Sequence, residues 1–316
     1  MTTGYDGPMI EVRDLCRSFG DTQAVDHVSF EVPRGSVFGY IGPNGAGKTT
    51  SMRILATLEL PTSGDALVEG LSSVNDPDRV RGRLGFMPDS FGTYGDTNCI
   101  EYLDFFARSY GLVGRDRTRR LRWVMEFTGL RPLATKPMRG LSKGMRQRLC
   151  LGRALIHDPA VLVLDEPAAG LDPRARIELR QIIRALAADG KTILISSHIL
   201  TELAEMCDRI GIIERGKLLA TGSVDDIRRT LQPTRELLVR VASDDTSAIE
   251  LLRSDSRATN VRVIDGAIRF SIAGDEADQV AILHALCDAR IEILEYTPQH
   301  NSLEDVFLQV TKGQVQ

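Results

Sequence analysis

The sequence predicts an α/β domain followed by a smaller α+β domain, and three observations support this prediction. A glycine-rich loop at residues 42–50 stands between an apolar, strand-like stretch and a helical pattern. Further along, short apolar runs typical of buried parallel strands alternate with helical stretches. Beyond Pro233 the order becomes strand, helix, two strands, helix and strand, which is typical of a ferredoxin-like fold. We therefore expect domains at residues 1–231 and 235–316, joined by a linker at 232–234.

The glycine-rich loop fits the P-loop pattern, in which two glycines separated by four residues precede Lys and Ser or Thr. Backbone N–H groups without neighbouring Cβ atoms, together with the positive end of the following helix, can hold a polyphosphate. Lys48 is expected to reach the β- and γ-phosphates, and the Thr49 hydroxyl to bind Mg²⁺. A chance glycine turn is the alternative. The nucleotide-binding residues predicted here are Gly42, Pro43, Asn44, Gly45, Ala46, Gly47, Lys48, Thr49 and Thr50.

Two alternating stretches before this loop, residues 10–15 and 25–32, predict strands at the edge of a sheet. Phe19 lies between them. An aromatic ring at this point could stack on a nucleotide base, although an isolated Phe is more often a core residue. The P-loop downstream favours the stacking role, so we include Phe19 in the predicted nucleotide site.

Two carboxylates follow the apolar run at residues 161–164, which predicts a buried parallel strand. Asp165 and Glu166 stand just past its end, where ligands bind in open α/β sheets. Another buried strand is expected at 192–195, and His198 follows it closely. A capping role for the carboxylates and a structural role for the histidine are the alternatives.

Residues 140–145 are expected to open a long helix that continues to about residue 156, with Ser142 as its N-cap. Ser142 and Gly144 would then offer a hydroxyl and a bare backbone at a helix N-terminus, which suits an anion. Five arginines at residues 115–122 predict a solvated helix face, because no aromatic residues are interleaved as in nucleic-acid platforms.

Composition narrows the range of functions. The 316 residues include 26% charged and 42% hydrophobic residues, with a formal net charge of −4, which gives no reason to expect nucleic-acid binding. The five cysteines are scattered and form no Cys-x-x-Cys pair, so we expect a reducing compartment and neither a disulfide framework nor a metal site. No signal peptide or membrane-spanning stretch is evident, which predicts a soluble, cytoplasmic chain whose membrane role would come through a partner.

The second domain carries no P-loop, metal-ligand spacing or nucleophile pattern. Its strand pair at 261–264 and 267–272 flanks Asp265 and Gly266, a strong hairpin signal. A terminal helix is expected at 302–310. We interpret the domain as a binding or docking module.

Five motifs occur in one order: the P-loop, Leu-Ser-x-Gly at a helix start, an apolar strand ending in Asp-Glu, a Gly-Leu-Asp-Pro turn, and a strand ending in His. In this order the chain resembles the nucleotide-binding subunit of ABC transporters over about residues 8–230. The tail after Pro233 resembles the C-terminal extension of exporter ATPases that handle drugs, lipids or polysaccharides. The resemblance implies a P-loop NTPase domain of the ABC-ATPase type, with a mixed sheet core and a helical subdomain, that uses ATP and Mg²⁺.

The resemblance also implies roles for individual residues. Asp165 would bind Mg²⁺, Glu166 would polarise the water that attacks the γ-phosphate, and His198 would contact that phosphate. Ser142 and Gly144 would close over the nucleotide of a second subunit. One cassette per chain therefore implies two copies, by default a homodimer, acting on a separate integral membrane permease at the cytoplasmic face of the membrane.

Asp172, in the Gly-Leu-Asp-Pro turn, would join the two subunits' sites, with a simple helix-start turn as the alternative. Two departures from the family pattern stand out. The signature reads Leu-Ser-Lys-Gly-Met, with Lys143 and Met145 in unusual positions. Asp89 replaces the glutamine usual after the preceding strand, and could still contact Mg²⁺ or its water.

Two other functions compete with an exporter ATPase. One is a non-transport ABC ATPase acting in translation, DNA repair or cofactor assembly. Translation types usually carry two cassettes and repair types long heptad insertions, and this chain shows neither. The other is a nucleotide-binding module without turnover. The joint presence of Lys48, Glu166 and His198 argues against it.

Overall fold

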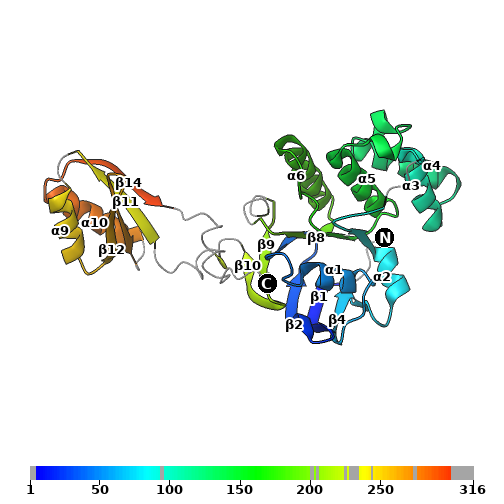
Figure 1. Cartoon of the computed structure of the whole chain (residues 1–316), viewed down its shortest axis with the longest axis horizontal. Coiled ribbons are helices and arrows are strands. Elements are labelled where there is room, and N and C mark those ends of the chain that lie inside the picture. Colours follow the sequence, from blue (N-terminus) through cyan, green and yellow to red (C-terminus); the bar gives the residue numbers. More distant parts are fainter. Residues whose placement is uncertain are drawn as a thin grey trace. The chain divides into compact units, whose positions relative to one another are not determined.

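The computed structural model describes residues 5–92, 96–199, 203, 206–223, 226–227, 235–242, 245–272 and 276–299. The chain divides into two compact units after residue 224 (Figure 1). The predicted linker at 232–234 and the predicted terminal helix at 302–310 lie outside the described residues. The domain limits 1–231 and 235–316 therefore remain predictions.

A six-stranded sheet in the order β10-β9-β3-β8-β7-β6 forms the centre of the first unit. Strands β9, β3, β8, β7 and β6 run parallel, and β10 is antiparallel to β9, so the sheet is mixed as expected. Every residue of β3, β7 and β8 is buried, which explains their apolar runs. The bounds are β3 Val37–Ile41, β6 Leu84–Met87, β7 Val161–Leu164, β8 Thr192–Ser197, β9 Arg209–Glu214 and β10 Lys217–Ser223.

A second, antiparallel sheet has the order β2-β1-β4-β5. Its strands are β1 Ile10–Phe19, β2 Thr22–Val32, β4 Ser63–Val68 and β5 Leu71–Ser72. The prediction that both early strands lie at a sheet edge is correct for β2 and wrong for β1, because β4 pairs with the other side of β1. Phe30 of β2 stacks on Phe38 of β3 at 5.0 Å between ring centroids, so one core joins the two sheets.

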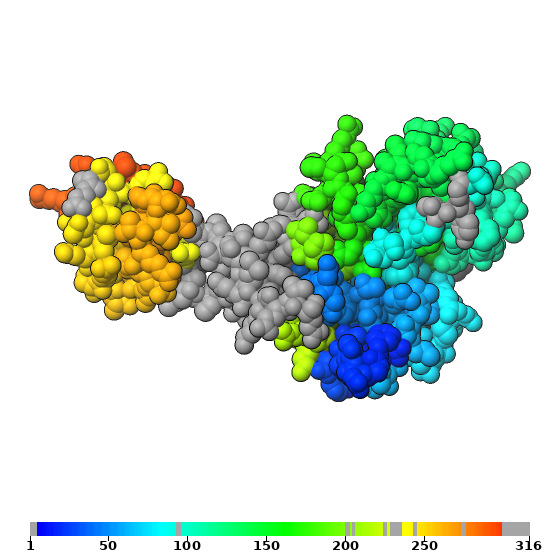
Figure 2. Space-filling view, in the orientation of Figure 1, coloured from blue at the N-terminus to red at the C-terminus, as the bar shows by residue number. Residues whose placement is uncertain are grey.

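The helices of the first unit are α1 Lys48–Leu55, α2 Pro77–Arg83, α3 Cys99–Ser109, α4 Gly114–Phe127, α5 Lys143–Leu155 and α6 Pro173–Ala188, with short 3₁₀ turns at Arg131–Leu133 and Met138–Gly140. Figure 1 shows α3, α4 and α5 grouped together, the helical subdomain that was expected. In Figure 2 this group and the N-terminal strands occupy separate parts of the face shown. No described helix has both the length and the apolar character that crossing a bilayer requires.

The arginine-rich stretch lies on α4. Its predicted solvated face is correct for Arg115, Arg119 and Arg122, which are exposed. It is wrong for Arg120, which donates to the Leu155 and Ile156 carbonyls and covers the Trp123 ring. This arginine ties α4 to the C-terminal end of α5.

The second unit contains β11 Arg235–Val241, α9 Thr246–Ser254, β12 Ala258–Ile264, β13 Ala267–Ile272, α10 Glu276–Asp288 and β14 Ile293–Gln299. Its antiparallel sheet has the order β12-β13-β11-β14, which confirms the ferredoxin-like prediction. Asp265 and Gly266 have φ angles of 50° and 72°, as the predicted Asp-Gly hairpin requires.

We predict an acid-sensitive contribution to stability from His157, which stacks on Tyr110 at 3.8 Å and donates from Nε2 to the Leu84 carbonyl at 3.1 Å. Burial lowers the pKa of His157 to about 4, below the usual 6.5 of the unfolded chain. The unfolded state therefore takes up the proton first, and up to about 3 kcal/mol of stability is lost as the pH falls from 6.5 to 4.

Denaturant unfolding across this pH range tests the prediction. His157→Gln should flatten the dependence of stability on pH. His284→Gln, at an exposed position of α10, should leave that dependence as in the wild type. An equal loss in all three proteins would contradict the assignment.

Candidate nucleotide-binding site

The P-loop runs from the end of β3 at Ile41 to the start of α1 at Lys48, as the sequence predicts. Glycine is required at both ends of the loop. A Cβ at Gly42 would lie 2.2 Å from the Ile213 carbonyl oxygen, and one at Gly47 would lie 2.3 Å from the Ala24 carbonyl oxygen. Gly47 also caps α1 with a φ of 103°, which L side chains rarely adopt.

Lys48 carries a buried charge, with 5% of its surface exposed. Its Nζ donates to the carbonyls of Gly42 at 2.6 Å and Pro43 at 3.1 Å, and lies 3.4 Å from Glu166 Oε1. Burial lowers the pKa of Lys48, and the nearby Glu166 carboxylate opposes that effect. The amine is thus fixed at the loop between two carbonyls and a carboxylate.

Asp165 is fully buried directly after β7. The Ser196 hydroxyl donates to its Oδ1 at 2.6 Å, while Oδ2 is buried with no hydrogen-bond partner among the described residues. Burial is the main cause that raises the pKa of Asp165, and the Ser196 and Thr49 hydroxyls oppose it. An unpartnered carboxylate oxygen beside Thr49 fits a hard cation such as Mg²⁺.

Glu166 connects the end of β7 to the end of the neighbouring strand β8. Its backbone lies in the left-handed region, with a φ of 47°. Its N–H donates to Ser196 Oγ at 2.9 Å, and its Oε2 accepts from Nδ1 of His198 at 2.8 Å. The carboxylate therefore lies between Lys48 and His198. Sequence reasoning missed Ser196, whose only signal was its position at a strand end just before His198.

The remaining residues predicted on this side are more exposed. Phe19 ends β1 with 46% of its surface exposed, and the Arg17 guanidinium lies 4.4 Å from its ring centroid. Asp89 follows β6, accepts from the Ser90 N–H at 2.7 Å, and adds negative charge that raises the pKa of Asp165.

Ser142, Gly144 and Asp172 form a separate group. Ser142 caps α5 by accepting from Met145 N–H at 3.3 Å, and Asp172 caps α6 by accepting from Ala175 N–H at 2.8 Å. All three line a shallow pocket of about 130 Å³ to which residues 42–50 do not contribute. Two helix N-termini therefore meet at one surface of the first unit.

Comparisons with known proteins agree with this geometry. Residues 25–169 match the model of the "ABC transporter" family, and residues 222–311 match "ATP-binding protein DrrA1-3-like, C-terminal domain". The Nod factor export ATP-binding protein I of Ralstonia nicotianae is 36% identical over 96% of this chain and 94% of that protein. The chain belongs to the ABC transporter family of ATP-binding proteins. Nothing in these matches favours a non-transport ATPase.

Other ABC transporter proteins give similar matches. The probable multidrug ABC transporter ATP-binding protein YbhF of Escherichia coli is 41% identical over 70% of this chain, which spans 38% of that protein's length. The bacitracin transport ATP-binding protein BcrA of Bacillus licheniformis is 34% identical over 96% of this chain and 98% of that protein. A solved ATP-binding subunit of an ABC transporter superposes with a TM-score of 0.64 at 32% identity, over 70% of this chain and 92% of that chain. These matches confirm the predicted family and fold.

We predict that Ser196→Ala weakens the nucleotide site, because the Ser196 hydroxyl bonds to both the Asp165 carboxylate and the Glu166 backbone N–H. The substitution leaves Asp165 and the Glu166 N–H without their shared partner, and hydrogen bonds to charged groups contribute about 1.5–3 kcal/mol. Thermal unfolding should show a loss of this order, and titration with ATP and Mg²⁺ should show weaker binding.

Ser197→Ala is the matched control, because among the described residues the buried Ser197 hydroxyl is hydrogen-bonded only to the nearby Ile199 N–H. It should cost less stability and leave nucleotide binding nearly unchanged. Equal effects of the two substitutions would show that Ser196 does not organise the carboxylates.

Proposed function

We propose that this chain is the ATP-binding and ATP-hydrolysing subunit of an ABC exporter, and that it drives a separate permease by dimerising on ATP. One observation carries the proposal: Lys48, Asp165, Glu166 and His198 converge at the carboxyl ends of β3, β7 and β8. A buried amine, a buried carboxylate and a carboxylate–imidazole pair beside a P-loop suit phosphoryl transfer to water.

The P-loop residues and Lys48 would hold the phosphates of ATP. The loop carbonyls already replace water around the Lys48 amine. A phosphate oxygen can therefore take the place beside the amine that Glu166 Oε1 now holds. Thr49 and Asp165, with Asp89 nearby, are the residues that would hold Mg²⁺. The ion, when bound, offsets negative charge on the phosphates. Phe19 would stack on the base from its exposed position.

Glu166 would act as general base on the attacking water, because its carboxylate stands beyond Asp165 and faces Lys48. His198 would position that carboxylate through the 2.8 Å bond from Nδ1 and contact the γ-phosphate with the other side of its ring. Both side chains follow buried strands, which fixes their backbones.

Dimerisation would bring the pocket at Ser142, Gly144 and Asp172 over the nucleotide of the second copy. The pocket's two helix N-termini suit an anion, and none of the P-loop residues 42–50 of the same chain lines it. A symmetric homodimer completes both sites with one interface. This pairing supports ATP as the ligand that holds the dimer together.

The proposal of export and of attachment to the membrane is based on the names of the relatives. Those reported above are named for transport of multidrug substrates, Nod factor and bacitracin. We therefore place this chain on the cytoplasmic face of the membrane, bound to an integral permease that selects the cargo.

The test of this proposal is Glu166→Gln. Loss of a general base should reduce steady-state ATP hydrolysis at least about a hundredfold. The variant should still bind ATP and form a stable dimer in sedimentation runs with ATP and Mg²⁺. Glu126→Gln, at an exposed position of α4, is the control and should hydrolyse ATP like the wild type. Near-normal turnover by Glu166→Gln would overturn the assignment of the base.

A further inference from the structure

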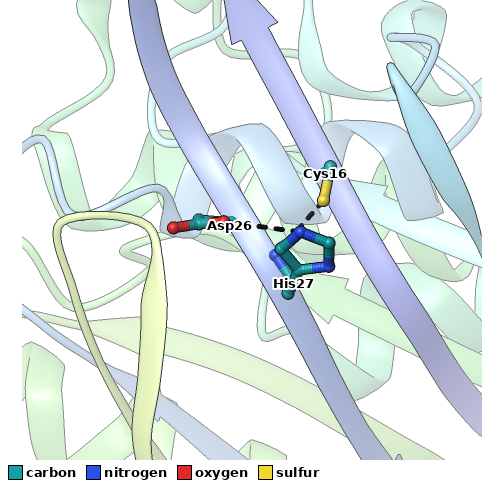
Figure 3. A group of neighbouring side chains, drawn as sticks. All are labelled: Cys16, Asp26 and His27. Atoms are coloured by element: carbon teal, nitrogen blue, oxygen red, sulfur yellow. Dashed lines mark hydrogen bonds and ion pairs between the residues drawn. The ribbon is translucent and has the colours of Figure 1, made fainter.

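Three register shifts interrupt the pairing of β1 with β2, and one of them is a β-bulge at Cys16. Leu15 pairs with Val28 and Arg17 pairs with Val25, so the single residue Cys16 faces both Asp26 and His27. His27 has a φ of 51°, in the left-handed region. Consecutive residues of a regular strand point to opposite faces, whereas a bulge re-aims one of them. The bulge thus brings the Asp26 and His27 side chains to Cys16 (Figure 3).

The three side chains form the one group of described residues whose potential ligand atoms lie close enough together to hold a metal ion. A thiol sulfur, an imidazole nitrogen and a carboxylate oxygen, one from each, all lie within 4.8 Å of one another. Cys16 is buried, while 66% of the His27 side chain is exposed, so an ion can enter from solvent. No disulfide involves Cys16, which is a free cysteine.

Hydrogen bonds prepare the His27 ring and the Cys16 sulfur to bind a cation. Asp14 Oδ1 accepts from His27 Nδ1 at 2.7 Å, which leaves Nε2 on the side of Asp26 Oδ1 at 3.9 Å. Metal-binding histidines typically have a carboxylate on the opposite ring nitrogen in this way. The His27 backbone N–H donates to Cys16 Sγ at 3.3 Å, which stabilises a thiolate.

The positive charge of the nearby Lys217 does not prevent a metal ion from binding to this group. Lys217 on β10 pairs with Asp26 through Oδ2 at 3.2 Å, whereas Oδ1 is the oxygen nearest the His27 ring. One carboxylate can therefore hold Lys217 and still offer an oxygen to a metal ion.

We propose that Cys16, Asp26 and His27 form a binding site for a divalent transition-metal ion of the zinc type. Sulfur, nitrogen and oxygen ligands in a tetrahedral set are typical of Zn²⁺, and water would take the fourth position. Binding replaces the thiol proton, which is released to solvent, with a metal–sulfur bond. The ion would bridge β1 and β2 at the bulge. This site does not depend on ATP hydrolysis.

Titration of the full chain with Co²⁺, after chelator treatment and without nucleotide, tests the site. One ion per chain should bind and give the thiolate-to-metal absorption band in the near ultraviolet, and Zn²⁺ should displace it. Cys16→Ser should abolish the band, while Cys287→Ser, at the exposed cysteine of the second unit, should retain it.

A second set of variants leaves the buried Cys16 unchanged. His27→Asn keeps a residue that tolerates a positive φ and should weaken binding, whereas His284→Asn should not. Asp14→Asn should weaken binding about 10–100-fold, as expected for a residue that orients a ligand. The proposal is overturned if the wild type shows no thiolate band, or if the band survives Cys16→Ser and disappears in Cys287→Ser.

Discussion

The buried amine of Lys48 is the charge on which the rest of the site depends. An ammonium ion is costly to bury unless it is hydrogen-bonded and paired. The Gly42 and Pro43 carbonyls and the Glu166 carboxylate meet that requirement together. They can do so only because β8 lies between β3 and β7 with their carboxyl ends aligned, as the pairing of Ile41 with Ser197 shows. The order of the parallel strands is therefore the constraint that builds the site.

The same network explains why unusual backbone conformations persist here. Glu166 lies in the left-handed region, which costs a non-glycine residue roughly 1–3 kcal/mol. Its N–H bond to Ser196 and its side-chain bond to His198 hold it there. At Gly47 the same kind of conformation is accommodated by the absence of a Cβ. Strain and buried charge thus gather at one edge of the sheet.

Local patterns made much of this predictable. Glycine spacing located the P-loop, and apolar runs located β7 and β8 with the polar residues after them. The role of Ser196 could not be predicted, because it depends on the register between β7 and β8, which no local pattern records. The central position of β1 depends likewise on its long-range pairing with β4.

The cysteines likewise show that local sequence patterns do not record long-range strand pairing. Their scatter along the chain argued against a metal site, yet a bulge in β2 places Cys16 beside two other potential ligands. A bulge shifts pairing by one residue, and the sequence around His27 carries no turn signal that would reveal it. In the second unit, by contrast, the Asp-Gly hairpin and regular spacing made all the described elements predictable.

If this ATP-binding protein drives a membrane permease, as proposed, the two proteins should purify together. The measurement is purification of the Glu166→Gln protein from detergent-solubilised membranes of its own host, with ATP and Mg²⁺ present throughout. An integral membrane protein with several spans should co-purify in near-equal amount. Recovery of only soluble proteins or nucleic acid would contradict the claim and favour a non-transport ABC ATPase.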